Sequence, residues 1–289
     1  MQLLRFATKP GVLRVWPPFQ PKWPLVTRLL GLGQFANADR VTVDLETTDK
    51  RGATVWSQRR LTGTFRHDWD LRRFPFDRHS LEILLEEGAQ EEDTFAYVAD
   101  VANSGYSLHA SVGGWRVVGM RVEVAPANYA TNFGDPTSLA QGGSRFARLR
   151  AVLELERTEY TGFLKLTATL YAAFLVCVIG SVVTITPTTF APRITVLGIS
   201  LFAVVVSMRA ASVALGSEHA ATLTDLLHVA GLAYVVAVTA VTVVVRMRLE
   251  GMADGAPGPV RLDRWGCFGA AALFVLGNAW LLLRAAMGA

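Results

Sequence analysis

The sequence has little cysteine and little charge, and each shortage excludes a class of protein. Only two of its 289 residues are cysteine. Cys177 and Cys267 lie far apart in apolar stretches, which excludes a disulfide framework and a zinc site built on closely spaced cysteine pairs. Charged residues make up 18% of the chain, whereas an ordinary soluble domain has roughly 25%. The composition is therefore not that of a typical soluble protein.

Catalytic motifs are absent as well. The sequence contains no Gly-x-Ser-x-Gly, His-Glu-x-x-His or phosphate-binding loop, so we expect no enzymatic activity and no cofactor. The formal net charge is +4, and 24 of the 28 basic residues are arginine. These arginines form no basic stripe with interleaved aromatic residues, so we predict no nucleic-acid partner.

Charge is missing altogether from three long stretches. They comprise residues 166–192, 226–245 and 265–283, which are 27, 20 and 19 residues long. A helix needs about 20 apolar residues to cross the hydrocarbon core of a bilayer. Each stretch therefore predicts a transmembrane helix.

With one further span that contains an arginine, the C-terminal half predicts four helices. They are expected at Gly162–Thr186, Arg193–Gly216, Thr224–Val245 and Trp265–Leu283. Residues 186–192 are expected to form a tight connection, and residues 246–264 a flexible loop. Four arginines in that loop mark the cytoplasmic side, because cytoplasmic loops carry an excess of positive charge. We therefore expect a multi-pass protein of the cell (inner) membrane, with the N-terminal domain and the C-terminus outside.

The N-terminal half alternates between apolar and polar residues. The alternating runs begin at Val41, Leu81, Val118 and Ala147, and turn-forming residues such as Gly113-Gly114 separate them. A period of two predicts strands with one buried face, and several such strands are typical of a β-sandwich. The predicted organisation is a β-sandwich over residues 1–158 and a four-helix transmembrane domain over residues 159–289.

The second predicted helix has an unusual face. One stripe along it consists of Thr195, Ile199, Phe202, Val206, Arg209 and Val213. A charged side chain inside a membrane costs at least about 2.5–3.5 kcal/mol unless it faces protein, water or the interface. A water-filled pore with an apolar constriction would need such a stripe. An ordinary packed helix whose arginine extends to the interface would show it too, so the residues alone leave both interpretations open.

A family resemblance favours the pore. The run Phe74-Pro75-Phe76-Asp77, within residues 72–83, resembles the signature loop of the pentameric ligand-gated ion channels, the Cys-loop receptor family. Val15-Trp16-Pro17-Pro18, Gly114-Trp115-Arg116-Val117 and Leu155-Glu156-Arg157 resemble further segments of that family, so the match covers nearly the whole chain. His67 and Leu81 stand where the family has its paired cysteines, as in bacterial members without the disulfide. Only about 15 residues precede Trp16, which implies an N-terminally shortened β-sandwich.

The resemblance implies a ligand-gated channel that conducts small ions. The subunit would assemble as a homopentamer in membrane lipid, with an unknown small-molecule or ion agonist. Its second helix would line the pore, with Phe202 as the narrowest ring and Arg193 at the pore entrance. The segment Phe190-Ala191-Pro192-Arg193 has no carboxylate and resembles the Pro-Ala-Arg segment of anion-selective members. We therefore expect an anion preference, the alternative being that Arg193 points away from the axis and that Arg209 pairs with Glu218 or another acidic group.

The resemblance also implies where gating and ligand binding occur. Asp77 and Arg157 would form a buried pair between the two domains, next to the loop residues Phe74, Pro75 and Phe76. Candidate residues of an aromatic cage for a cation or small amine are Phe95, Tyr97, Tyr129 and Phe133. For each of these aromatics, packing in the core is the competing interpretation. The competing function is a non-conducting membrane sensor or binding module with the same fold.

Overall fold

The computed structural model describes residues 33–52, 54–106, 113–134, 143–216, 220–250 and 257–287. The chain separates into two compact units. The first contains the strands and comprises residues 1–69 and 78–158, whereas the second comprises residues 70–77 and 159–289. The short segment Asp70–Asp77 thus belongs to the helical unit although strands precede and follow it in the sequence.

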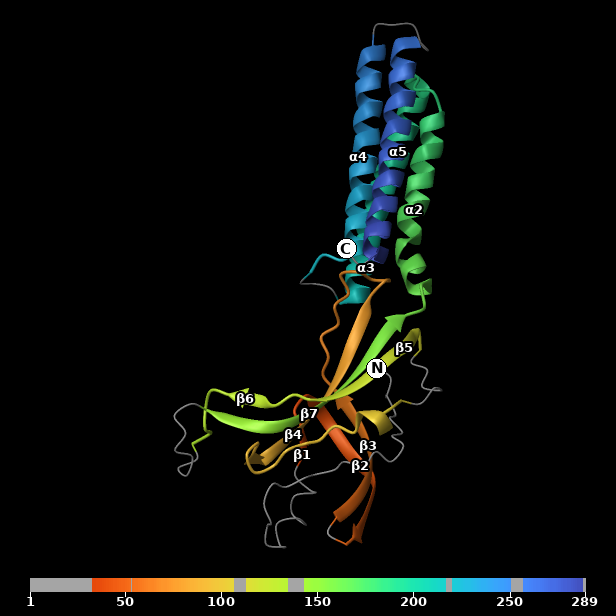
Figure 1. Cartoon of the computed structure of the whole chain (residues 1–289). Helices are drawn as coiled ribbons and strands as arrows, with labels where there is room; N and C mark the ends of the chain where they lie inside the picture. Colours follow the sequence, from red (N-terminus) through yellow and green to blue (C-terminus); the bar gives the residue numbers. More distant parts are fainter. Residues whose placement is uncertain are drawn as a thin grey trace. The chain divides into compact units, whose positions relative to one another are not determined.

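The first unit is built from antiparallel strands (Figure 1). They are β1 (Gly33–Phe35), β2 (Ala38–Arg51), β3 (Thr54–Phe65), β4 (Arg78–Glu91), β5 (Trp115–Val124), β6 (Ala127–Tyr129) and β7 (Ser144–Arg157), with a short 3-10 turn, η1, at Val101–Asn103. One sheet has the order β1-β4-β7-β5, with β6 also paired to β7, and β2 and β3 form a second sheet. The predicted strands at residues 41, 81, 118 and 147 are all present, as β2, β4, β5 and β7.

The register of the larger sheet separates apolar from charged side chains. Leu81 lies opposite Leu153, and Leu85 opposite Leu149, on one face. The other face carries ion pairs that cross the strands: Arg78 and Arg116 with Glu156, Arg121 with Glu154, Arg150 with Glu82 and Glu123, and Arg148 with Glu86. Because successive side chains of a strand point to opposite faces, the alternation in the sequence produces this division directly.

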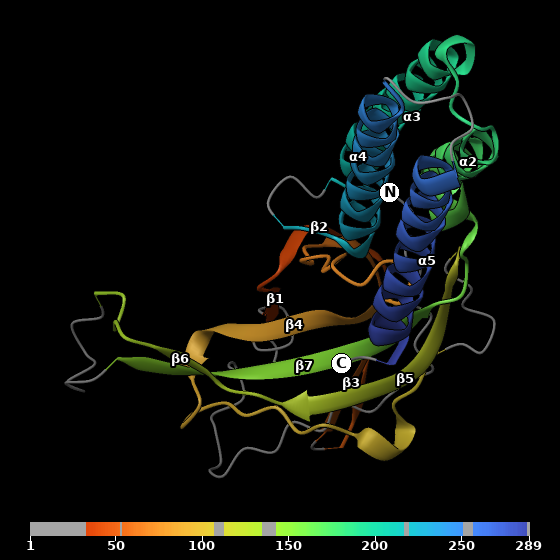
Figure 2. The ribbon, with the colours of Figure 1, turned by 90° about the horizontal axis from the view of Figure 1, so that it is seen from above.

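The described part of the second unit contains four long helices (Figures 1 and 2). They are α2 (Thr161–Val182), α3 (Pro187–Leu215), α4 (Leu223–Leu249) and α5 (Pro257–Met287). Each is long and apolar enough to cross a membrane, which supports a multi-pass membrane protein. Helix α3 packs against α2 and α4, and α5 packs against α4 and α2. Helices α3 and α5 therefore occupy opposite corners of the bundle.

Two helices begin earlier than the sequence predicted. Residues 187–192 were expected to form a connection, but α3 starts at Pro187, with the Thr186 hydroxyl accepting a hydrogen bond from the Thr189 amide. Helix α5 starts at Pro257, inside the segment expected to be a loop. Both prolines occupy the first helical turn, where proline is tolerated because the amide hydrogen it lacks has no partner in the helix.

The core of the helical unit lies between α2, α3, α4 and α5. Its most buried residues include Leu170, Val204, Leu227 and Val238. Helices α2 and α4 approach closely at Gly231, where an added Cβ would lie 2.2 Å from a methyl group of Leu170. The absence of a side chain at Gly231 thus permits the close approach of α2 and α4.

Candidate functional site

The two faces of α3 differ sharply. Its buried residues are Arg193, Leu197, Ser200, Val204 and Ala211. The predicted stripe lies on the opposite side: Thr195, Ile199, Phe202, Val206, Arg209 and Val213 are all exposed in the single chain. Phe202, in the middle, has 70% of its surface exposed. We call these six residues the α3 stripe. The structure thus brings together on one outward face the residues that the sequence assigned to a pore.

The chemistry of the α3 stripe changes along the helix. At one end the Thr195 hydroxyl donates a hydrogen bond to the Ala191 carbonyl oxygen at 3.0 Å. The centre is apolar, and Arg209 follows toward the other end. Among the described residues Arg209 forms no ion pair, and Glu218, its suggested partner, lies outside them. The stripe therefore presents an apolar band beside one exposed cation.

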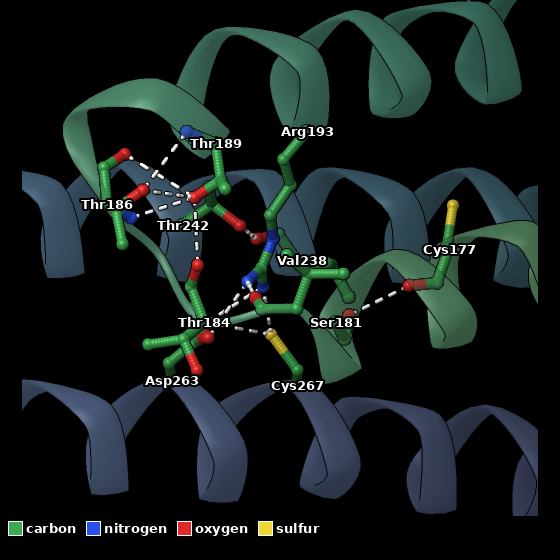
Figure 3. Close-up of polar contacts among 11 residues, drawn as sticks. Cys177, Ser181, Thr184, Thr186, Thr189, Arg193, Val238, Thr242, Asp263 and Cys267 are labelled. Atoms are coloured by element: carbon green, nitrogen blue, oxygen red, sulfur yellow. Dashed lines mark hydrogen bonds and ion pairs between the residues drawn. The ribbon is translucent and has the colours of Figure 1, made fainter. Parts of the chain in front are cut away.

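Arg193, which the sequence suggested for a pore entrance, lies on the buried face of α3. Its guanidinium is buried between helices, where Nη1 and Nη2 donate to Oδ2 and Oδ1 of Asp263 on α5, both at 2.8 Å (Figure 3). The two side chains are only 4% and 5% exposed. Nη2 also lies 3.1 Å from the sulfur of Cys267. Arg193 occupies the buried face of α3 and its charge is neutralised, as the alternative in the sequence analysis allowed.

The segment Asp70–Asp77 docks on the helices. The Phe74 ring is buried and packs on Phe163 of α2, with ring centroids 6.2 Å apart. Phe76 packs on Tyr160 just before α2 at 5.9 Å, and Pro75 between them is buried. The carbonyl oxygen of Arg72 accepts a hydrogen bond from the amide of Leu223, the first residue of α4. Residues of the predicted gating loop are thus part of the helical core.

The predicted pair of Asp77 and Arg157 joins residues of different units and stays a prediction. Asp77 is buried at the end of the docked segment. Within the strand unit, the Arg157 guanidinium lies over the ring of Trp115, with its central carbon 4.1 Å from the ring centroid. A cation over the face of an indole is a favourable arrangement, so Trp115 positions this arginine.

The four candidate cage aromatics lie in two separate clusters. Phe95 and Tyr97 are buried and pack edge to face at 5.0 Å, together with Ala147 and with Leu85 and Leu149. Burial raises the pKa of the Tyr97 hydroxyl. For this pair the structure agrees with the competing interpretation of core packing, because neither ring is open to a ligand.

Tyr129 and Phe133 form the second cluster, with Phe146. The Tyr129 centroid lies 5.1 Å from that of Phe133 and 5.9 Å from that of Phe146. The Tyr129 hydroxyl donates to Oε1 of Glu86 at 2.7 Å, and this hydrogen bond, more than burial, raises the pKa of Tyr129. The neighbouring Arg148 forms an ion pair with the same carboxylate. Phe133 is exposed, so this cluster is open to solvent and lies on the charged face of the sheet.

Polar residues around the signature loop also form a cluster. Nε2 of His67 lies 3.4 Å from Nδ1 of His79, and both imidazoles contact the ring of Trp69. Burial, and then the charge of His79, lower the pKa of His67. Asp70 forms an ion pair with Arg72. In the part of the chain that the structure describes, no group of three or more histidine, cysteine or acidic residues could hold a metal ion.

The remaining sequence candidates cannot be placed. The segment Val15-Trp16-Pro17-Pro18 and residues 135–142, which follow the candidate Phe133, lie outside the described residues. Sequence reasoning missed Asp263, the partner of Arg193, although a carboxylate at the border of the charge-free stretch 265–283 was a usable signal. No protein-family model matches the chain, and no curated protein matches it. Function is therefore inferred from the residues and their geometry.

Proposed function

We propose that the chain is a subunit of a homopentameric ligand-gated ion channel with a pore lined by α3. The observation that carries this proposal is the α3 stripe, an exposed helix face that contains Arg209. Facing lipid, this arginine would cost at least about 2.5–3.5 kcal/mol. Facing a water-filled axis shared by several copies, it keeps its hydration. A ring of subunits with α3 innermost removes the conflict.

The order of the helices is compatible with such a ring. Helix α3 lies between α2 and α4, and α5 occupies the opposite corner. A ring centred on the α3 stripe therefore puts α5 on the outside. The outward residues of α5 include Leu273, Leu276 and Leu283, which are exposed in the single chain and suit contact with lipid. Native mass measurement of the detergent-solubilised protein should show a pentamer, whereas only monomer or dimer would contradict the ring.

The centre of the stripe supplies the gate. Ile199, Phe202 and Val206 cover about 10 Å of helix length at a rise of 1.5 Å per residue. Rings of apolar side chains in a narrow pore exclude water and so block ions. Phe202, with the largest side chain of the three, forms the narrowest ring.

Gating involves the strand unit and the docked segment. We assign the strand unit as a β-sandwich on the outside of the cell membrane. Phe74, Pro75 and Phe76 then transmit its movements to α2 and α4, with Asp77 and Arg157 as the connecting pair. Tyr129 and Phe133 remain candidates for the agonist site because their cluster is open to solvent, whereas Phe95 and Tyr97 serve the core.

An anion preference depends on Arg209 alone, because Asp263 neutralises Arg193. A ring of Arg209 side chains raises the local concentration of anions, and charged rings are one established source of selectivity. Reversal potentials in asymmetric salt should follow the anion equilibrium potential, and Arg209→Gln should weaken that preference. A reversal potential near the cation equilibrium value contradicts the anion preference and leaves the channel itself untouched.

The decisive experiment is ion flux from purified protein in liposomes. The substitution Phe202→Ser should wet the constriction and raise the basal flux. Leu273→Ser, which makes a comparable change on the outward face of α5, is the matched control and should leave the flux unchanged. If Phe202→Ser conducts no more than the parent in a functional channel, the gate lies elsewhere. If neither the parent nor the variant conducts ions, the competing function of a non-conducting sensor is correct.

A further inference from the structure

The start of α5 carries a second ordered surface, distinct from the α3 stripe. Four residues occupy positions i, i+3, i+4 and i+7 of the helix and so share one face: Arg261, Arg264, Trp265 and Phe268. All four are exposed, and Trp265 has 80% of its surface exposed. We call these residues the arginine–tryptophan stripe. A large exposed indole next to two arginines suits a partner that is apolar at one end and negatively charged at the other.

The orientation of this stripe is fixed by what packs behind it. On the adjoining face of α5, Asp263, Cys267, Ala271 and Phe274 are buried in the bundle. The ion pair between Arg193 and Asp263 joins the first turns of α5 to α3 across the bundle (Figure 3). The arginine–tryptophan stripe therefore cannot turn inward without breaking a buried ion pair.

The positive charge of this end is not compensated within the described chain. Arg261 and Arg264 form no ion pair with any described residue, and the same holds for Arg246 and Arg248 near the end of α4. The nearby carboxylate of Asp263 is occupied by Arg193. Helices α4 and α5 pack side by side, so these arginines gather where α4 ends and α5 begins, at one end of the bundle.

The spacing along α5 matches the profile of a bilayer. From Trp265 to Leu283 the helix extends about 27 Å at 1.5 Å per residue, close to the roughly 30 Å of a hydrocarbon core. Its exposed residues over this length include Val275, Leu276 and Leu283. Trp265 then lies at the edge of the hydrocarbon, where tryptophan is enriched. Arg261 lies about 6 Å further out, at the depth of the lipid phosphates.

We propose that the arginine–tryptophan stripe binds the headgroup of an anionic phospholipid. The two guanidinium groups contact the phosphate and the added negative charge of the headgroup, since guanidinium binds phosphate oxygens through paired hydrogen bonds. The indole of Trp265 packs on the glycerol region, and Phe268 contacts the start of an acyl chain. Basic residues at the ends of transmembrane helices are known to select anionic lipids. This inference requires that α5 spans a membrane and is independent of channel activity.

Tryptophan quenching by brominated lipids tests the proposal. The full-length protein is reconstituted in phosphatidylcholine vesicles that contain either brominated phosphatidylglycerol or brominated phosphatidylcholine. The difference between the parent and Trp265→Phe isolates the signal of this one indole. We expect phosphatidylglycerol to be preferred over phosphatidylcholine by about fivefold or more, because one basic residue near an anionic surface contributes about that factor.

The matched variants are Arg261→Gln with Arg264→Gln, and Arg284→Gln at the far end of the same helix, where the guanidinium lies over Trp280. The double variant should reduce the preference to near one, and Arg284→Gln should leave it unchanged. Equal quenching by both lipids in the parent, or a preference that survives the double variant, overturns the proposal. Loss of the preference in Arg284→Gln as well would also overturn it, since the effect would then be that of net charge.

Discussion

The ion pair of Arg193 and Asp263 makes a strong prediction about stability. Both side chains are almost fully buried, and two hydrogen bonds of 2.8 Å join them. Replacing Asp263 by asparagine keeps the shape of the side chain but removes its charge. The guanidinium of Arg193 then stays buried with no anion beside it.

The expected loss is large because an uncompensated buried charge is costly. Breaking one side of a buried pair typically costs about 3–5 kcal/mol. For a chain of this size each kcal/mol lowers the melting temperature by roughly 2–4 °C. Asp263→Asn should therefore melt roughly 6–20 °C below the parent. Replacing both residues by apolar ones, Arg193→Met with Asp263→Leu, should recover most of this loss, because buried pairs are often neutral relative to packed apolar side chains.

The assay is thermal unfolding of the detergent-solubilised protein, followed by tryptophan fluorescence. The matched control is Asp39→Asn, which removes the same charge from the exposed pair of Asp39 and Arg66. Exposed pairs contribute about 0–1 kcal/mol, so this control should melt within a few degrees of the parent. The reasoning is refuted if Asp263→Asn melts like the control, or if the double apolar variant is as unstable as the two single losses added together.

Three further predictions concern other parts of the chain. Gly231→Leu should destabilise the helical unit by about 1–3 kcal/mol through overpacking against Leu170, and adding Leu170→Ala should restore part of that loss in thermal unfolding; no restoration contradicts the contact. Gly143 has φ +95°, and a Cβ there would meet the Tyr129 carbonyl oxygen at 1.9 Å, so Gly143→Ala should speed hydrogen exchange at residues 127–129. The pKa of His67 is lowered on folding, so the unfolded chain binds the proton more readily and stability should fall as pH drops below about 6.5. In denaturant titrations at pH 5.5 and 7.5, His67→Gln should reduce the difference in the free energy of unfolding between the two pH values. An unchanged difference would refute the role of His67.

The elements that the sequence predicted well are those with a clear alternation of apolar and polar residues or with a long stretch free of charge. Strands β4 and β7 were predictable because their residues alternate, and α2 and α4 because charge is missing from them. The α3 stripe was predictable for a related reason. Residues three or four apart in the sequence share one face of a helix, so the residues on the exposed face of α3 could be named from their spacing. The early start of α3 was not predicted, because Pro187 was interpreted as part of a connection rather than as the first turn of a helix.

Contacts between distant residues were beyond the sequence. Nothing local connects Arg193 with Asp263, which lies 70 residues away. The grouping of the candidate aromatics was predictable in part. Successive side chains of a strand point to opposite faces of the sheet, so Leu85 and Glu86 must lie on opposite faces. Tyr129 contacts Glu86, and Phe95 packs with Leu85. Once the register was known, the four aromatics could therefore not form a single ligand cage within one chain. The register itself required the structure.

The docked segment has a consequence for how the protein is made. Residues 70–77 are synthesised early, but the α4 residue that bonds to Arg72 is Leu223. At roughly 5–20 residues per second, translation from residue 77 to residue 223 takes about 7–30 seconds. For the first part of that interval, until Phe163 of α2 has been made, the ring of Phe74 has no helix to pack on. For all of it the carbonyl oxygen of Arg72 lacks its partner on α4. During this interval a chaperone can bind residues 70–77 and a protease can cut them. The interval ends when α4 has been synthesised.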